Sequence, residues 1–241
     1  MTKVLLIEDD DIIGEMISMY LTEESFEVLR CHNGQDGVSA FSEFQPDIIL
    51  LDLMLPDFEG TDLCNTLRSM TAVPIIIISS NSKVSEKIEA FTVGADDYLC
   101  KPFSMHEMKA RILAFLRRSQ QQVAAAPEHA VLQTAQVVPP AALRSAQSGL
   151  HMNLETRTLS VRGETVEMTF SEFELMRLLY EHPQRVFRRE ELINALRGFD
   201  SYINDRSIDV HITNLRRKIE VNPKEPKHIK TVWGVGYKFM L

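Results

Sequence analysis

The sequence predicts a doubly wound α/β domain with a parallel sheet, followed by a smaller α+β domain built as a winged helix-turn-helix. Short apolar runs alternate with amphipathic stretches five times between residues 4 and 118. This alternation is typical of a parallel sheet with helices on both faces. After residue 150, short strand patterns precede three helical patterns and a final hairpin pattern. Three helices followed by a hairpin favour a winged helix-turn-helix.

Five strands and five helices are expected in the first domain. The strands are expected at residues 4–7, 28–31, 48–51, 75–78 and 98–100, and the helices at about 11–24, 35–44, 60–70, 83–92 and 104–118. The last helix presents Met108, Ile112, Phe115 and Leu116 at helical spacing, which predicts one face buried against the sheet.

A change of composition divides the chain into residues 1–118, a linker at 119–149, and residues 150–241. The linker holds eight Ala, six Gln and three Pro, but only two charged residues, Glu128 and Arg144. Its prolines argue against one continuous helix, so we expect a long, semi-flexible connection. A short Ala/Gln helix inside it is left open.

The second domain is expected to begin with short strands and to end with a hairpin. The strands are expected at 152–154, 158–162 and 166–168, the helices at about 172–182, 188–196 and 205–220, and the hairpin at 229–241 with its turn at 234–236. Ser171 and Glu174 fit a capping box at the start of the first of these helices.

Charge is distributed unevenly over the chain, although the total of -8 is modest. Residues 1–118 hold 10 Lys and Arg against 20 Asp and Glu, whereas residues 150–241 hold 15 against 13. The two halves therefore have different electrostatic roles. No apolar run is long enough to span a membrane and no signal peptide opens the chain, so a cytoplasmic location without membrane contact is expected. Cys31, Cys64 and Cys100 lack CxxC spacing and are expected to be reduced thiols.

Two predicted strands end in acidic residues. Residues 48–51 lead into Asp52, and residues 4–7 lead into Glu8 and Asp9. The carboxyl ends of parallel strands meet at the edge of the sheet where ligands bind. Any one of these acids also fits a plain turn cap, but three carboxylates together repel one another and suit a hard cation such as Mg²⁺. We therefore expect an Mg²⁺ site with Asp52 as a phosphoryl acceptor.

Several motifs carry a resemblance to a known family. They are Glu8-Asp9, Asp52, Ser79, Gly94-Ala95-Asp96-Asp97-Tyr98 and Lys101-Pro102. With these motifs, residues 1–118 resemble the receiver domain of two-component response regulators. The whole chain except the linker resembles the OmpR/PhoB family of transcription factors. The resemblance implies a flavodoxin-like receiver with strand order 2-1-3-4-5, joined to a winged helix-turn-helix DNA-binding domain.

The resemblance assigns the metal ligands and the acceptor. Asp52 would take the phosphoryl group as an aspartyl-phosphate. Glu8 and Asp9 would hold Mg²⁺ together with Asp52, and the main-chain carbonyl of Met54 would complete the protein ligands.

Three further side chains receive roles from the same resemblance. Lys101 would pair with the acceptor and then with the phosphoryl oxygens, aimed by a cis peptide before Pro102. Ser79 would offer its hydroxyl to the phosphoryl group. Tyr98 would act as the switch aromatic that turns inward, although its spacing alone also fits a core tyrosine of an edge strand.

Six charged residues match the intersubunit ion pairs of the family. The pairs are Lys87 with Glu107, Asp97 with Arg111, and Asp96 with Arg118. Scattered charges on exposed faces ordinarily only solvate a surface. The resemblance instead implies a two-fold homodimer that phosphorylation favours.

The helix expected at 205–220 has an apolar stripe and a polar, basic face. Ile208, Ile212, Leu215 and Ile219 form the inward stripe. The pattern by itself fits an amphipathic helix with a solvated basic end, whereas the resemblance makes it a DNA-recognition helix. By that resemblance Arg206, His211, Thr213 and Arg216 would hold the DNA backbone, and Asp209, Val210 and Asn214 would face bases.

The hairpin after this helix resembles the wing with one departure. Many members carry Arg where this chain has Trp233, so the chain departs from the family at the residue that would insert a charge into the minor groove. Packing of Trp233 on the sugar-phosphate backbone is the alternative. Gly234 and Gly236 supply the tight turn.

The expected function is transcriptional regulation in response to phosphorylation. The expected partners are a sensor histidine kinase, promoter DNA with tandem direct repeats, a second copy of the chain, and RNA polymerase near residues 197–204. An aspartyl-phosphate phosphatase would share the nucleophile and the metal, but its DxD pattern is absent because Leu53 and Met54 follow Asp52. A regulator that uses its receiver only for dimerisation would not require the acid, hydroxyl and lysine set.

Overall fold

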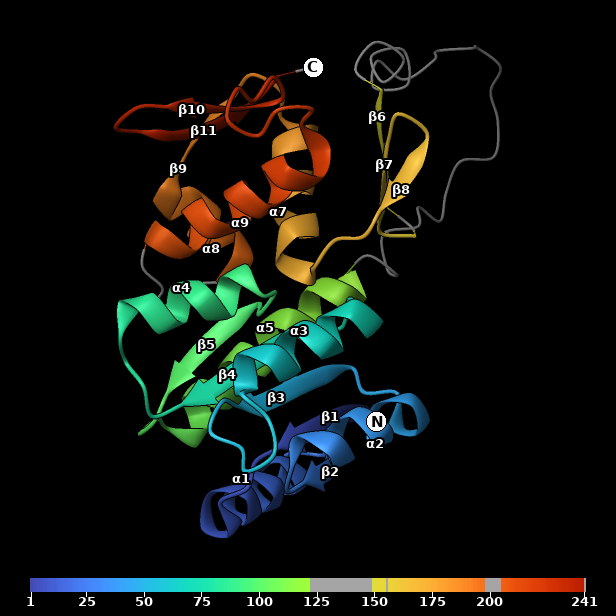
Figure 1. Ribbon diagram of the computed structural model, residues 1–241, viewed down its shortest axis with the longest axis vertical. Helices are drawn as coiled ribbons and strands as arrows, with labels where there is room; N and C mark the ends of the chain where they lie inside the picture. The colour runs from blue at the N-terminus through green and yellow to red at the C-terminus, as the bar shows by residue number, and fades with distance from the viewer. Residues whose placement is uncertain (122–148, 155, 198–204, 241) are drawn as a thin grey trace, which may run out of the picture.

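The computed structural model of the protein describes residues 1–121, 149–154, 156–197 and 205–240 (Figure 1). Two domains, each with its own apolar core, lie against one another. Within these residues, every helix is too short or too polar to cross a lipid bilayer.

The first domain is built on one parallel sheet. Its strands are β1 (Thr2–Ile7), β2 (Phe26–Cys31), β3 (Ile48–Asp52), β4 (Ile75–Ser79) and β5 (Asp97–Cys100). They run in the order β2-β1-β3-β4-β5, which confirms the predicted topology. β3 and β4 are completely buried because helices cover both faces, and this explains their unbroken aliphatic sequence.

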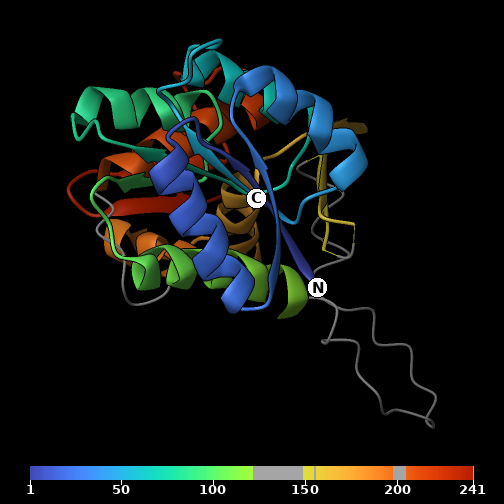
Figure 2. The same ribbon diagram turned by 90° about the horizontal axis from the view of Figure 1, so that it is seen from below.

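Five helices cover this sheet. They are α1 (Asp11–Glu23), α2 (Gly34–Phe44), α3 (Gly60–Met70), α4 (Val84–Thr92) and α5 (Met105–Gln121). α1 and α5 lie on one face, and α2, α3 and α4 on the other (Figure 2). The predicted stripe of α5 is buried, as expected. The helix continues to Gln121, so residues 119–121 of the expected linker are helical, and residues 122–148 lie outside the described residues.

The second domain places three helices between two small sheets. Its elements are β6 (Leu150–Asn153), β7 (Thr158–Val161), β8 (Glu164–Val166), α7 (Phe170–Glu181), β9 (Val186–Arg188), α8 (Arg189–Arg197), α9 (Asp205–Ile219), β10 (Ile229–Val232) and β11 (Gly236–Phe239). The sheets have the orders β6-β7-β8 and β10-β11-β9. The predicted helices and hairpin are present, but the prediction missed β9, because three residues are too few to show a strand period.

The predicted capping box of α7 was wrong in register by two residues. Thr169 is the N-cap and pairs with Glu172: the Thr169 hydroxyl accepts from the Glu172 N–H, and the Glu172 carboxylate accepts from the Thr169 N–H. Thr169 precedes an apolar residue that begins the helix, so it fits the capping pattern equally well. Ser171 and Glu174 are buried inside the first two turns and serve other contacts.

The predicted state of the three cysteines is confirmed. All are free, with Cys31 and Cys64 buried and Cys100 partly exposed. Burial raises the pKa of the Cys64 thiol to about 12, which makes it an inert core residue.

Candidate functional site

Three carboxylates meet at the carboxyl edge of the receiver sheet. Asp52 closes β3 and Glu8 follows β1, and these strands are neighbours with Ile7 beside Leu51. Carboxylate oxygens of Glu8, Asp9 and Asp52 lie within 4.8 Å of one another. Glu8 and Asp52 are buried, whereas Asp9 is exposed to solvent. The sheet therefore brings the predicted metal ligands together with one open side.

Lys101 supplies the positive charge within this cluster. It follows β5, and its Nζ donates to both oxygens of Glu8, at 2.9 and 2.8 Å, and to Asp52 Oδ2 at 2.5 Å. Burial and the nearby Asp52 raise the pKa of Glu8 to about 7, against the lowering effect of the Lys101 ammonium. The peptide between Lys101 and Pro102 is cis, as the resemblance implied.

Ser79 and Tyr98 lie next to one another beyond the carboxylates. Ser79 closes β4, is 1% exposed, and its Oγ accepts from the Asn81 N–H at 3.2 Å. The Tyr98 hydroxyl donates to the Asn81 carbonyl at 2.8 Å, and burial raises its pKa. The two predicted switch residues therefore both hydrogen-bond to Asn81 in the loop between β4 and α4, and the ring of Tyr98 is buried.

Met54 contributes its backbone and not its side chain. Its N–H donates to Asp52 Oδ1 at 3.0 Å, and its side chain is 70% exposed. The loop after β3 therefore fixes the orientation of the Asp52 carboxylate.

Arg30 is a site residue that the sequence analysis missed. From β2, its guanidinium donates to the carbonyls of Glu8 and Asp10, at 3.3 and 3.1 Å, and to Asp11 Oδ1 at 3.1 Å. A Cβ on Gly14 would lie 2.2 Å from Arg30 Nε, so only glycine leaves room for this side chain. The sequence signal that could have indicated it is Gly14 inside a predicted helix. A glycine there lowers stability by about 0.5–1 kcal/mol relative to alanine, so it suggests that the space is needed for another group.

The residues expected at a dimer interface make contacts within the chain. Arg111 pairs with Asp97 at 2.9 Å and with Glu107 at 2.6 Å. Asp96 pairs with Arg68 at 2.6 Å. The ammonium of Lys87 lies 5.5 Å from the centre of the Tyr98 ring, and the side chain of Arg118 lies outside the described part. The intersubunit pairs stay a prediction.

One edge of α9 lies against α4 of the receiver (Figure 1). Asn214 Nδ2 donates to the Phe91 carbonyl at 3.3 Å, and the His211 and Phe91 rings meet edge to face at 5.5 Å. Val210 packs on the apolar cluster between the receiver sheet and its helices α2–α4. His211 is 2% exposed and Asn214 8% exposed. Three residues assigned to DNA recognition thus contact the receiver.

The other residues assigned to DNA are distributed over α9 and the wing. Asp209 accepts from Arg189 Nε at 2.8 Å and from the Tyr237 hydroxyl at 2.6 Å. Arg216 donates to the Ile229 carbonyl and to the Thr231 hydroxyl, which ties α9 to β10. Thr213 is exposed, Trp233 is 90% exposed, and the side chain of Arg206 lies outside the described part.

Comparison with known proteins gives the same two domains. Residues 4–113 match the family model "Response regulator receiver domain", and residues 163–239 match "Transcriptional regulatory protein, C terminal". The chain is 36% identical over 238 residues to the sensory transduction protein RegX3 of Mycolicibacterium smegmatis, with 99% of each chain covered. The chain belongs to the OmpR/PhoB family of response regulators. It is therefore a transcriptional regulator with a receiver domain and a DNA-binding domain.

Other members are similar to this response regulator along its whole length. It is 34% identical over 234 residues to the uncharacterized transcriptional regulatory protein YcbL of Bacillus subtilis, with 97% of this chain and 98% of that one covered. The alignments with two solved structures each cover 100% of this chain and 99% of the solved chain. A RitR mutant has a TM-score of 0.76 at 25% identity, and DrrB, an OmpR/PhoB homologue from Thermotoga maritima, has 0.50 at 26%.

Proposed function

We propose that this response regulator is switched on by transfer of a phosphoryl group from a sensor histidine kinase to Asp52. The observation that carries the proposal is the group of three carboxylates within 4.8 Å, two of which bind Lys101. Burying two neighbouring carboxylates lowers the stability of the fold unless a positive charge balances them. Such clusters are therefore found mainly where the carboxylates have a chemical role.

The donor set fits Mg²⁺. Glu8, Asp9 and Asp52 offer hard oxygen ligands, and the Met54 carbonyl would complete the protein ligands. Burial is the main cause of the raised pKa of Glu8, and the charge of Asp52 raises it further, so a divalent cation beside these groups would favour their charged form. Bound there, Mg²⁺ would neutralise charge on the phosphoryl oxygens.

The residues of the chain have separate tasks in the transfer. A carboxylate oxygen of Asp52 forms the new bond to phosphorus, while the bond from phosphorus to the kinase imidazole breaks and its electron pair stays on the imidazole. Lys101 moves its hydrogen bond from Asp52 to a phosphoryl oxygen, and the Ser79 hydroxyl donates to another. Positioning and charge balance supply most of the catalysis in such transfers.

The output of the phosphorylated chain is binding to promoter DNA in the cytoplasm. Dimerisation through α4, β5 and α5 would raise the effective concentration of two α9 helices on tandem direct repeats. Contact with RNA polymerase would follow at the promoter. Asp52 accepts and slowly loses the group without turnover of a substrate, in keeping with a family of transcriptional regulators and not of enzymes.

Light scattering after size exclusion tests the link between the acidic site and assembly. The wild type and Asp52→Ala are compared in Mg²⁺, with and without beryllofluoride, an analogue of the phosphoryl group. We expect a dimer only in the treated wild type. The control is Asp62→Ala, an exposed acid in the first turn of α3, which should respond like the wild type. A treated wild type that stays monomeric at tens of micromolar would refute phosphorylation-driven dimerisation.

A further inference from the structure

The hairpin of β10 and β11 ends in an exposed apolar tip. Trp233 is 90% exposed and Val235 is 42% exposed, one on either side of Gly234. The hairpin extends from the second domain and is clear of the receiver (Figure 1). Indole rings are large and are mostly buried in folded proteins. An indole held in water at the end of a projecting hairpin therefore favours a binding partner that covers it.

The turn at this tip is tight and stands in open space. The Val235 N–H donates to the Val232 carbonyl at 3.0 Å, and of the two central residues only Gly234 has a positive φ, of 73°. A positive φ at the third residue alone is the pattern of a type II turn. A Cβ on Gly234 would meet nothing within 4 Å. Trp233, the second residue of the turn, is therefore presented on a compact, protruding tip.

The base of the hairpin is fixed to α9. Ile229 and Phe239 pair across the two strands and are fully buried. Arg216 of α9 donates through Nη2 to the Ile229 carbonyl at 2.7 Å and to the Thr231 hydroxyl at 2.8 Å. The hairpin and the helix assigned to DNA thus form one rigid unit. A duplex bound along α9 would meet the tip at a fixed base-pair position.

Two lysines give the hairpin a positive flank. Lys230 and Lys238 lie opposite one another in β10 and β11, so they share one face of the hairpin. Like charges in opposite positions destabilise a strand pair, and a nearby anion would remove this effect. Among the residues that the structure describes, neither lysine has a carboxylate partner. This face therefore suits a polyanion such as the phosphate backbone of a duplex.

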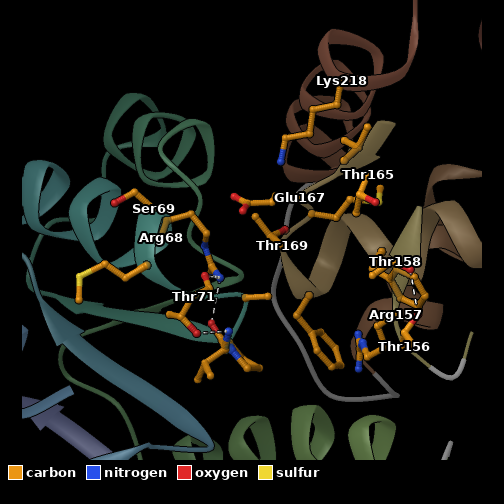
Figure 3. Close-up of a pocket in the computed structure, with 18 of the residues that line it drawn as sticks. Arg68, Ser69, Thr71, Thr156, Arg157, Thr158, Thr165, Glu167, Thr169 and Lys218 are labelled. Atoms are coloured by element: carbon orange, nitrogen blue, oxygen red, sulfur yellow. Dashed lines mark hydrogen bonds between the residues drawn. The ribbon is translucent and has the colours of Figure 1, made fainter. Parts of the chain in front are cut away.

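The cations that line the cleft between the two domains are, in contrast, already neutralised. This cleft has a volume of about 810 Å³ and lies between the loop after α3 and the strands β7 and β8 (Figure 3). Its three labelled cations have carboxylate partners: Arg68 binds Asp96, Arg157 binds Glu174, and Lys218 binds Glu172. Of the two surfaces, the hairpin is the one whose positive charge remains available to phosphate.

Trp233 carries no charge, so it cannot use the negative potential of a narrow minor groove, which attracts arginine. An indole gains instead by leaving water and by stacking on a base. Bases of an intact duplex are already stacked on both sides, so a base face is available only where a step between two base pairs opens. Apolar side chains that enter the minor groove open such steps and kink the duplex. Pyrimidine–purine steps open most readily.

We propose that Trp233 is an apolar wedge that enters the minor groove of the bound duplex and stacks on a base at an opened step. It thereby selects a flexible pyrimidine–purine step at a fixed distance from the bases that contact α9. Val235 packs on the neighbouring sugar, and Lys230 and Lys238 bind phosphates beside the opening. The inference rests on the proposed function, because it names a specificity determinant of the same DNA-binding domain.

The fluorescence of Trp233 tests the wedge directly, because the chain contains a single tryptophan. The full chain in Mg²⁺ and beryllofluoride is titrated with a duplex that the same treated chain recovers from a random-sequence pool. Stacking on a base should remove most of the tryptophan emission, and a fluorescent adenine analogue at the selected step should brighten as it unstacks. Emission that persists in the complex would place the indole on the sugar-phosphate backbone and overturn the wedge.

Substitutions of the exposed ring should leave the fold intact by circular dichroism, so they isolate its role in binding. Trp233→Ala should raise the dissociation constant of the duplex about tenfold, and Trp233→Phe, which keeps a stacking ring, at most about threefold. Leu154→Ala, which removes an exposed apolar side chain after β6, is the control and should bind like the wild type. Affinity unchanged in Trp233→Ala would refute the wedge.

The charged variant Trp233→Arg distinguishes stacking from electrostatic attraction. It should keep most of the affinity at low salt, but the logarithm of its binding constant should fall more steeply with the logarithm of salt concentration, by about one unit of slope, because it adds a charge to the contact. Its complex should no longer brighten the adenine analogue. Equal brightening by Trp233→Arg and by the wild type would show that the step opens without the indole, against the proposal.

Sequencing of the selected pools separates the wedge from the function it serves. The treated wild type should enrich a pyrimidine–purine step at one position, whereas Trp233→Arg should lose that step and enrich runs of A·T pairs, whose narrow groove attracts arginine. Equal frequencies of the step in the pools of wild type and Trp233→Ala would refute the wedge alone. If no chain enriches any sequence, the DNA-binding part of the proposed function fails, and the wedge fails with it.

Discussion

The acidic edge of the receiver and the contact between α9 and α4 both gather residues to which the sequence assigned a function, but they differ in what those residues face. At the acidic edge, Glu8, Asp52 and Lys101 face one another. At the domain contact, Val210 and Asn214 face the receiver instead of solvent. Strand ends have their neighbours fixed by sheet topology, whereas a helix face can pack on any surface that complements it.

Removing Lys101 should give the largest effect, because it tests whether the acidic edge is held together from within. Lys101→Met leaves Glu8 and Asp52 buried without their cation. We expect the free energy of unfolding to fall by about 3 kcal/mol in urea at neutral pH without Mg²⁺. Saturating Mg²⁺ should recover part of this loss. A loss below about 1 kcal/mol would mean that Lys101 does not hold the cluster.

Arg30 extends the same test to the loop that carries the acids. Arg30→Met removes the donors to the carbonyls of Glu8 and Asp10. Because such supporting groups orient metal ligands, we expect the Mg²⁺ dissociation constant to rise about tenfold by calorimetry. Arg30→Lys keeps the charge but not the planar fork. If Arg30→Lys binds Mg²⁺ like the wild type, charge alone and not the shape of the guanidinium supports the loop.

Thr169 tests a neighbouring part of the contact between the two domains, because it caps α7, whose Phe170 ring meets Phe115 of the receiver. Thr169→Ala removes the hydroxyl that accepts from the Glu172 N–H. A lost cap of this kind costs about 1 kcal/mol of unfolding free energy. Thr169→Ser should retain the stability of the wild type. Equal losses in both variants would show that the methyl group, and not the cap, matters at this position.

Removing a surface ion pair that lies outside both the acidic edge and the domain contact should have the smallest effect, and it serves as the reference for the other variants. Arg185 and Glu191 pair at 3.1 Å with side chains 52% and 42% exposed. Since solvent screens such pairs, Arg185→Ala should change the free energy of unfolding by less than about 0.5 kcal/mol, measured in urea. A larger change would mean that stability alone cannot distinguish the two regions from ordinary surface.

The local sequence pattern was sufficient to predict an element where a periodic repeat of apolar residues or a turn-forming residue determines it. The five strands of the first domain, the stripe of α5 and the stripe of α9 from Ile208 to Ile219 lie where they were predicted. The misses came from sites where several residues fit one pattern or where an element is very short. Thr169 and Ser171 are both plausible caps, and β9 pairs with β11 only after the chain has folded back on itself.

The parallel receiver sheet, the acids at its carboxyl edge and the amphipathic character of α9 follow from local residue patterns, because they depend on residue period and on the ends of consecutive strands. The remaining contacts form only when the chain has folded. Arg30 reaches the acidic loop from β2 through the space above Gly14, and Phe170 reaches the receiver core from the second domain. Contacts between residues far apart in the chain depend on shape complementarity between finished surfaces, which no local pattern of residues contains.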